Sequence, residues 1–216
     1  MNKHSVLKAI IIGLPLWLSG CGLLSSETVS ELETDTAVVA NKVEVVAGKS
    51  VVLPQPFQYG ANLTASQLIT ATWQEETHQL PVQLEVTPEK IVLAGFSSWG
   101  TRLFSLAYQD HRFDSYIMPG LAASLPQPEQ VLFNIMLTLW PVEAWQPLLA
   151  VQGMSLVDTQ GRRQLLDSNQ QVVIDIQYRA VPHLDGEIIF KNMQLGYVIS
   201  IKTLTYSQNN VEQGND

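Results

Sequence analysis

The residues best placed to do chemistry are two adjacent serines, Ser97 and Ser98, in the string Gly-Phe-Ser-Ser-Trp-Gly. An activated serine would attack an acyl group, and a nucleophile elbow of the form G-x-S-x-G would expose it. The string has one residue too many for this motif, and it leads into a predicted strand where the elbow requires a helix. We therefore expect no serine nucleophile here.

The other polar side chains form neither a metal site nor an acid–base pair. His78, His111 and His183 stand at no metal-ligand spacing from one another, and Cys21 is the single cysteine, so a zinc site is not expected. Glu75-Glu76 is expected to be a solvated turn, and the sequence has no phosphate-binding glycine loop. We predict a protein that is not an enzyme and holds no metal and no cofactor.

Cys21 is the one residue whose neighbours indicate a covalent modification. Lys3 and Lys8 precede the apolar segment Ala9–Leu18, and Leu18-Ser19-Gly20-Cys21 closes it. A basic start and a short apolar segment are typical of a secretory signal, and this segment is too short to cross a bilayer as a helix. The closing run matches the lipobox of bacterial lipoproteins, whose cysteine receives a diacylglyceryl group and an N-terminal acyl chain. We expect Cys21 to become the lipidated first residue, which two or three acyl chains anchor firmly.

The chain is acidic, with 20 acidic and 12 basic residues and a formal net charge of −8. We therefore expect no nucleic acid partner, and only local, hydrophobic contact with a membrane beyond the anchor. Gly22 follows the cysteine, where an aspartate commonly signals inner-membrane retention. We expect a lipid-anchored monomer at the periplasmic face of the outer membrane.

Four segments are expected along the chain: a signal peptide at 1–20, a lipidated N-terminus and acidic tether at 21–50, a folded domain at 51–206 and a frayed polar tail at 207–216. Within the tether, residues 29–46 leave room for one short helix or an edge strand. A folded domain of this length is sufficient to bury a hydrophobic core.

Most of the folded domain has the two-residue period of half-buried strands. Short turns separate the first strands, as in an antiparallel meander, and further strands follow a helical insertion. The predicted strands are 67–74, 80–86, 91–96, 102–108, 112–117, 172–178 and 197–201. With nine or ten strands, the sheet should close or half-close to hide its edges. The sequence thus predicts a mainly β fold with a helical insertion, in which a curved antiparallel sheet forms an unclosed or half-closed barrel.

The insertion predicts two helices, one over 129–140 that begins after Pro128 and a second over 142–150. The first is apolar on most of its circumference, whereas a surface helix shows a cleaner polar face. It is either ordinary core packed over the sheet or a lid over an apolar cavity for acyl chains. The residues expected to line that cavity are Leu84, Leu93, Phe104, Leu106, Leu132, Met136, Trp140, Trp145, Ile174 and Ile176.

Three short stretches carry a resemblance to a known family: residues 95–104, residues 139–141 (Leu-Trp-Pro) and residues 196–197 (Gly-Tyr). Over roughly residues 50–203 the chain resembles LolB, the outer-membrane lipoprotein receptor. It is more similar to the uncharacterised LolB-like lipoproteins often found beside aryl-polyene biosynthesis genes. LolB receives lipoproteins from the periplasmic carrier LolA, holds their acyl chains in its cavity and releases them into the outer membrane. The resemblance implies the same fold and role here, with a LolA-like carrier and acylated lipoproteins as partners.

LolB has a protruding loop that ends in an exposed leucine within an Asn-Pro-Leu-Gly segment. Ser97, Ser98, Trp99 and Gly100 fall at that place, so Trp99 matches the leucine and the resemblance implies a membrane-insertion loop. Tryptophan prefers the membrane interface, so this difference is compatible with insertion. Trp99 folded back into the core is the alternative, since tryptophan is highly buried on average.

Two other functions stay open beside lipoprotein transfer. The same fold would serve a carrier for a dedicated lipid or a polyene-linked product. A solid core would instead suit a structural accessory lipoprotein that binds only other proteins. Lipoprotein transfer and lipid carriage both require an apolar cavity, whereas the accessory protein does not.

Overall fold

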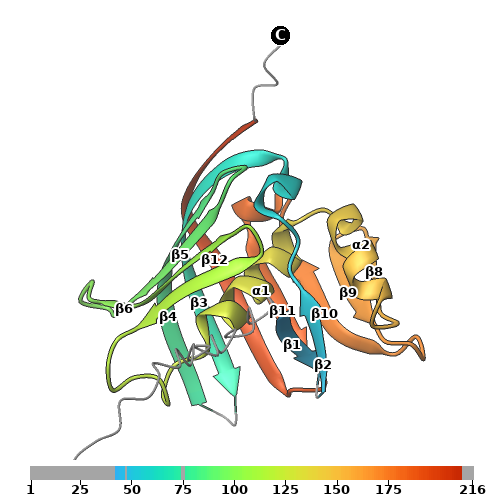
Figure 1. Ribbon diagram of the computed structural model, residues 1–216, viewed down its shortest axis with the longest axis horizontal. Coiled ribbons are helices and arrows are strands. Elements are labelled where there is room, and N and C mark those ends of the chain that lie inside the picture. Colours follow the sequence, from blue (N-terminus) through green and yellow to red (C-terminus); the bar gives the residue numbers. More distant parts are fainter. Residues whose placement is uncertain (1–41, 47, 74–75, 211–216) are drawn as a thin grey trace, which may run out of the picture. The chain divides into compact units, whose positions relative to one another are not determined.

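The computed structural model describes residues 42–46, 48–73 and 76–210, and within them a ten-stranded antiparallel sheet dominates (Figure 1). Its strands are β3 (Ala61–Trp73), β4 (Glu76–Val86), β5 (Ile91–Phe96), β6 (Arg102–Gln109), β7 (Arg112–Ile117), β8 (Ser155–Thr159), β9 (Arg162–Leu166), β10 (Val172–Tyr178), β11 (Glu187–Asn192) and β12 (Tyr197–Asn210). A separate hairpin consists of β1 (Lys42–Val46) and β2 (Lys49–Val52).

The large sheet joins two meanders, β3 to β7 and β8 to β12, through the pairing of β3 with β12 at its centre. Its order places β7 at one end and β8 at the other, and these two strands do not pair with each other. The predicted mainly β fold with an unclosed, curved antiparallel sheet is therefore confirmed. The connection from β7 to β8 contains both helices, α1 (Pro128–Leu139) and α2 (Val142–Ala150).

Alternation of apolar and polar residues sets the strand faces. In β5, Ile91, Leu93 and Gly95 are buried, while the residues between them are half-buried. Gly95 pairs with Phe104, whose ring occupies the place that a side chain would need. A Cβ built on Gly95 would lie 2.4 Å from Phe104 Cε1, so the glycine is required by this close approach.

Helix α1 lies against both halves of the sheet, since it contacts β6 on one side and β11 on the other, as well as β1 (Figure 1). It begins with Pro128, carries Glu129 in its first turn and has buried residues around its whole circumference from Val131 to Thr138. The first predicted helix is therefore confirmed, and the second matches α2 at both ends. No helix in the described ranges is both long and apolar enough to cross a membrane.

Two expectations about the ends of the folded domain were wrong. The tether does not extend to residue 50, because β1 begins at Lys42 and its Val43 and Val45 are buried in the core. The tail does not fray from Ser207, because β12 continues to Asn210, which pairs with Ala61. Strands β8, β9 and β11 were not predicted individually. Strand β8 has two successive apolar residues instead of an alternation, and β9 and β11 each contain three charged or amide side chains. The signal peptide, Cys21 and the tether as far as residue 41 lie outside the described residues.

Candidate functional site

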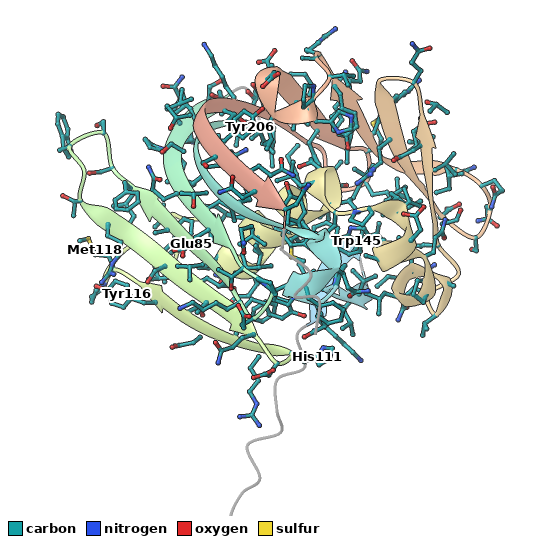
Figure 2. All side chains as sticks on the ribbon, turned by 90° about the horizontal axis from the view of Figure 1, so that it is seen from above. Glu85, His111, Tyr116, Met118, Trp145 and Tyr206 are labelled. Carbon is teal, nitrogen blue, oxygen red and sulfur yellow. The ribbon has the colours of Figure 1, made fainter. Side chains whose placement is uncertain are left out.

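The residues predicted to line a cavity come together in one buried hydrophobic cluster. Nine of them lie on β4, β5, β6, α1, α2 and β10, and Trp140 directly follows α1. Each is almost fully buried: Leu84, Leu93, Phe104, Leu106, Leu132, Met136, Trp140, Trp145, Ile174 and Ile176. Trp145 of α2 is labelled in Figure 2. Its ring stands edge-on to that of Phe133 of α1, and the two ring centroids are 5.8 Å apart. Two pockets on the described surface are lined by none of these ten residues. The role of the ten residues as an acyl-chain site therefore stays a prediction.

A buried arginine fixes the C-terminal end of α1 to the sheet. Arg163 of β9 donates from Nη1 to the carbonyl oxygens of Leu137 and Trp140, at 2.8 and 2.7 Å. Its Nε and Nη2 bind both carboxylate oxygens of Asp158, at 2.7 and 2.8 Å. Pro141 has no N–H, so it cannot donate the helical hydrogen bond to the Leu137 carbonyl. Arg163 Nη1 donates to that carbonyl instead. Sequence reasoning missed Arg163, although it shares a buried face of β9 with Leu165 and that position is unusual for a cation.

A tyrosine completes the polar support of this helix end. Tyr178 of β10 donates its hydroxyl to the carbonyl oxygen of Thr138 at 2.8 Å, and burial raises the pKa of that phenol. His183 stacks on the Tyr178 ring with centroids 3.6 Å apart. Burial, together with the nearby Arg163 charge, lowers the pKa of His183. The helix end thus rests on neutral aromatic groups and one paired cation.

The segment before β3 holds the same helix end from the other side. The Trp140 indole donates from Nε1 to the Gln55 carbonyl at 3.3 Å, and the Tyr59 ring packs on the indole at 4.8 Å. Tyr108 donates its hydroxyl to the Leu53 carbonyl at 2.9 Å, which ties this segment to β6. Burial, and to a lesser degree Tyr206, raises the pKa of Tyr59 to about 12.

Two buried polar atoms have no hydrogen-bond partner among the described residues. They are Oε1 of Gln67 on β3 and the indole Nε1 of Trp145 on α2. A buried donor or acceptor without a partner costs about 1–3 kcal/mol. Gln67 Oε1 and Trp145 Nε1 are thus the buried side-chain atoms that the described residues leave without a hydrogen bond.

Trp99 stands at the tip of the tight loop between β5 and β6. The Gly100 N–H donates to the Ser97 carbonyl at 2.9 Å, and the Ser97 N–H donates to the Thr101 carbonyl at 2.8 Å. Gly100 has a φ of 80°, which a residue with a side chain adopts only with strain. Trp99 is 88% exposed, so the expectation that its ring lies in solvent is confirmed.

Of the two serines considered for catalysis, Ser97 has a structural partner. Ser97 Oγ accepts the Thr101 N–H at 3.1 Å and so stabilises the loop. Ser98 follows it in the turn of the same loop, and no helix begins there. Within the described ranges, no three His, Cys, Asp or Glu side chains are grouped so that they could hold a metal ion.

A family model described as a protein of unknown function (DUF3261) matches residues 64–205. The chain belongs to the DUF3261 family. The match includes the Trp99 loop, both helices and Arg163, whereas β1, β2 and residues 56–59 precede it. The polar support at the end of α1 is therefore only partly within the DUF3261 region, because Gln55 and Tyr59 lie outside it.

Several solved structures share features of the DUF3261 fold at low similarity. A LolA superfamily protein from Nitrosomonas europaea has 8% identity and a TM-score of 0.40, covering 73% of this chain and 91% of that one. A domain described as an outer membrane lipoprotein-sorting protein from Vibrio parahaemolyticus has 9% identity and the same TM-score, covering 73% and 88%. A DUF1329 family protein from Desulfovibrio piger has 9% identity and a TM-score of 0.33, covering 76% and 96%. No curated protein matches the chain.

Proposed function

We propose that this protein is a lipoprotein receptor at the periplasmic face of the outer membrane, anchored through Cys21. It accepts the acyl chains of lipoproteins from a LolA-like carrier, shelters them in its core and releases them into the membrane. Its role is binding and transfer rather than catalysis. The observation that carries the proposal is the exposed Trp99 at the tip of a rigid loop.

A large apolar ring in water is unfavourable unless a membrane or a partner covers it. Two main-chain hydrogen bonds and the left-handed Gly100 define the loop backbone, and the 88% exposure of Trp99 shows that its ring is not folded back onto the sheet. Transfer of the ring from water into the bilayer interface would contribute on the order of 2 kcal/mol. That contribution is too small to hold the protein on a membrane alone, but it orients a protein that a lipid already anchors.

The second support is the helix that the sheet surrounds. Helix α1 is buried on every side, and it stands between the two halves of an unclosed sheet. Met136 lies on α1 and Trp140 directly follows it, and the flexible methionine side chain adapts readily to an acyl chain. An acyl chain that entered the core would lie among these apolar side chains and near the unpaired Trp145 Nε1.

Substitution of Met136 by tryptophan tests whether the core accepts a ligand. If there is space beneath α1, Met136→Trp fills it, leaves the melting temperature unchanged and weakens binding of a fluorescent fatty-acid probe. If the core is solid, the larger side chain lowers the free energy of unfolding by about 1–3 kcal/mol and the unmodified protein binds no probe. Val157→Trp, at an exposed position of β8, is the matched control and should change neither quantity.

The probe result also separates the alternative functions. No binding by the unmodified protein contradicts both transfer functions and favours an accessory lipoprotein. Binding of the probe without transfer of an acylated lipoprotein from a LolA-like carrier favours a carrier for a dedicated lipid. Binding and transfer together support the proposal.

A further inference from the structure

We infer that the end of the sheet around Trp99 docks on an anionic phospholipid bilayer, with Arg102 as the side chain that binds the lipid phosphates. The inference rests on the proposed membrane contact of Trp99, and it adds the lipid class that this surface prefers. The surface comprises the loop of Trp99, the adjoining start of β6, and the end of β7 with the segment after it.

The charge distribution sets this surface apart from the rest of the chain. The segments Ile91–Gln109 and Ser115–Pro128 contain no aspartate or glutamate, although the chain has 20 acidic residues and a net charge of −8. Their one charged residue is Arg102. Strand β4 begins with Glu76, but its stretch Gln79–Val82, which ends at the partner of Gly95, is uncharged. An isolated cation in an uncharged region of an acidic protein favours contact with an anion.

The two uncharged segments lie side by side. Strand β6 pairs with β7, and the Met118 N–H donates to the Leu103 carbonyl at 2.8 Å just beyond the last paired residues. Figure 2 shows Tyr116 and Met118 at one end of the β6–β7 hairpin and His111 at the other end. The end that carries Met118 is also the end at which β6 begins after Trp99.

Arg102 is exposed and already oriented by an aromatic ring. Its guanidinium carbon lies 5.5 Å from the centroid of the Tyr116 ring, and Tyr116 is 44% exposed. The planar guanidinium binds phosphate oxygens through two parallel N–H groups, and a cation–π contact with a ring does not use those groups. Tryptophan and tyrosine both concentrate at the level of the headgroups. Trp99, Tyr116 and Arg102 therefore match the apolar and anionic layers of a bilayer interface.

The segment after β7 adds apolar side chains to the same surface. Met118, Leu121 and Leu125 are half-buried, and Ala122 and Ala123 between them are exposed. The segment turns back on itself, with the Leu121 N–H donating to the Met118 carbonyl at 3.1 Å. This segment would contact the acyl boundary beside Trp99, while Arg102 contacts the phosphates.

The test compares vesicles of phosphatidylcholine with vesicles that also contain phosphatidylglycerol. Residues 21–216 are used with Cys21→Ser, so that no lipid anchor masks the contact and all the described core residues remain. The measured quantity is the ratio of binding constants for the two vesicle types at low salt. One basic residue near an anionic surface changes binding by about fivefold. Arg102→Gln should lower the ratio by about that factor, and Arg102→Lys should lower it less.

Arg112→Gln is the matched control, because Arg112 is exposed and lies at the opposite end of β7. It should leave the ratio unchanged. An unchanged ratio in Arg102→Gln, or an equal fall in Arg112→Gln, would overturn the inference. If the parent protein binds no vesicles but self-associates, and Trp99→Glu abolishes that self-association, the inference is overturned. The surface around Trp99 would then bind a second copy of the chain. Trp99→Glu could lose binding to both vesicle types while Arg102→Gln leaves the ratio unchanged. That result would support the proposed membrane contact of Trp99 and contradict only the preference for anionic lipid.

Discussion

Replacement of Arg163 by methionine should destabilise the protein strongly. Methionine keeps much of the packing volume but removes every donor that Arg163 supplies to the end of α1. The carbonyl oxygens of Leu137 and Trp140 would lose bonds of 2.8 and 2.7 Å. Each buried acceptor left without a partner costs about 1–3 kcal/mol. The lost contact with Asp158 adds little, because that side chain is 43% exposed and water can replace the arginine.

The expected loss in the free energy of unfolding is therefore about 2–5 kcal/mol, a large fraction of the total stability of a domain this size. Urea unfolding, followed by far-UV circular dichroism, measures it. Asp158→Asn is the informative partner variant, because it preserves the bonds to both carbonyls and should cost less. An ordinary surface substitution changes the free energy of unfolding by about 0.5 kcal/mol or less. A change that small in Arg163→Met would contradict the role of Arg163 in stabilising the end of α1.

Two further predictions concern the anchor and the pH dependence of stability. Cys21→Ala should leave an unprocessed or soluble protein without acyl label, and a variant that still carries label in the outer-membrane fraction would contradict lipidation. Burial lowers the pKa of His183 from its usual 6.5, so the unfolded chain takes up the proton first as the pH falls. Stability should therefore decrease from about pH 7.5 to about pH 5.5, above the range in which carboxylates titrate. His183→Phe keeps the stacking on Tyr178 and should reduce that decrease, and an unchanged pH profile would contradict the assignment.

The sequence predicted those elements whose stability depends on a simple periodic burial. Strands β5 and β10 and helix α2 have their predicted bounds, because their apolar residues alternate or repeat and turn residues or prolines mark the ends. Strand β7 also has its predicted bounds, although none of its residues is fully buried, because the turn at Asp110 and His111 marks its start. The long pairing of β3 with β12 joins residues far apart in the chain, so local pattern could not reveal that the polar Ser207–Asn210 segment is a strand. A polar segment on a sheet is held by its main-chain bonds, which leave no trace in hydrophobicity.

The candidate site was predicted in part for the same reason. The apolar residues around α1 were found, since burial follows from their type, and Trp99 was expected at a loop tip. Arg163 and Tyr178 were missed, because their partners are main-chain carbonyls at the end of a helix. Those carbonyls become acceptors only once Pro141 ends the helix beside β9 and β10. The sequence predicted that the helix ends before Pro141, but it could not show that β9 and β10 lie beside that end.

The central claim is that Trp99 inserts into the membrane during transfer. The rate at which Trp99→Glu delivers a lipoprotein into membranes tests that claim most directly. Labelled lipoprotein would be loaded from a LolA-like carrier onto the lipidated protein, and its appearance in outer-membrane vesicles would be followed over time. We expect Trp99→Glu to load normally and to unfold at the same temperature as the parent, because the ring is 88% exposed, but to deliver slowly. Trp99→Leu, which keeps an apolar tip, should deliver nearly as well as the parent. Normal delivery by Trp99→Glu would contradict the account.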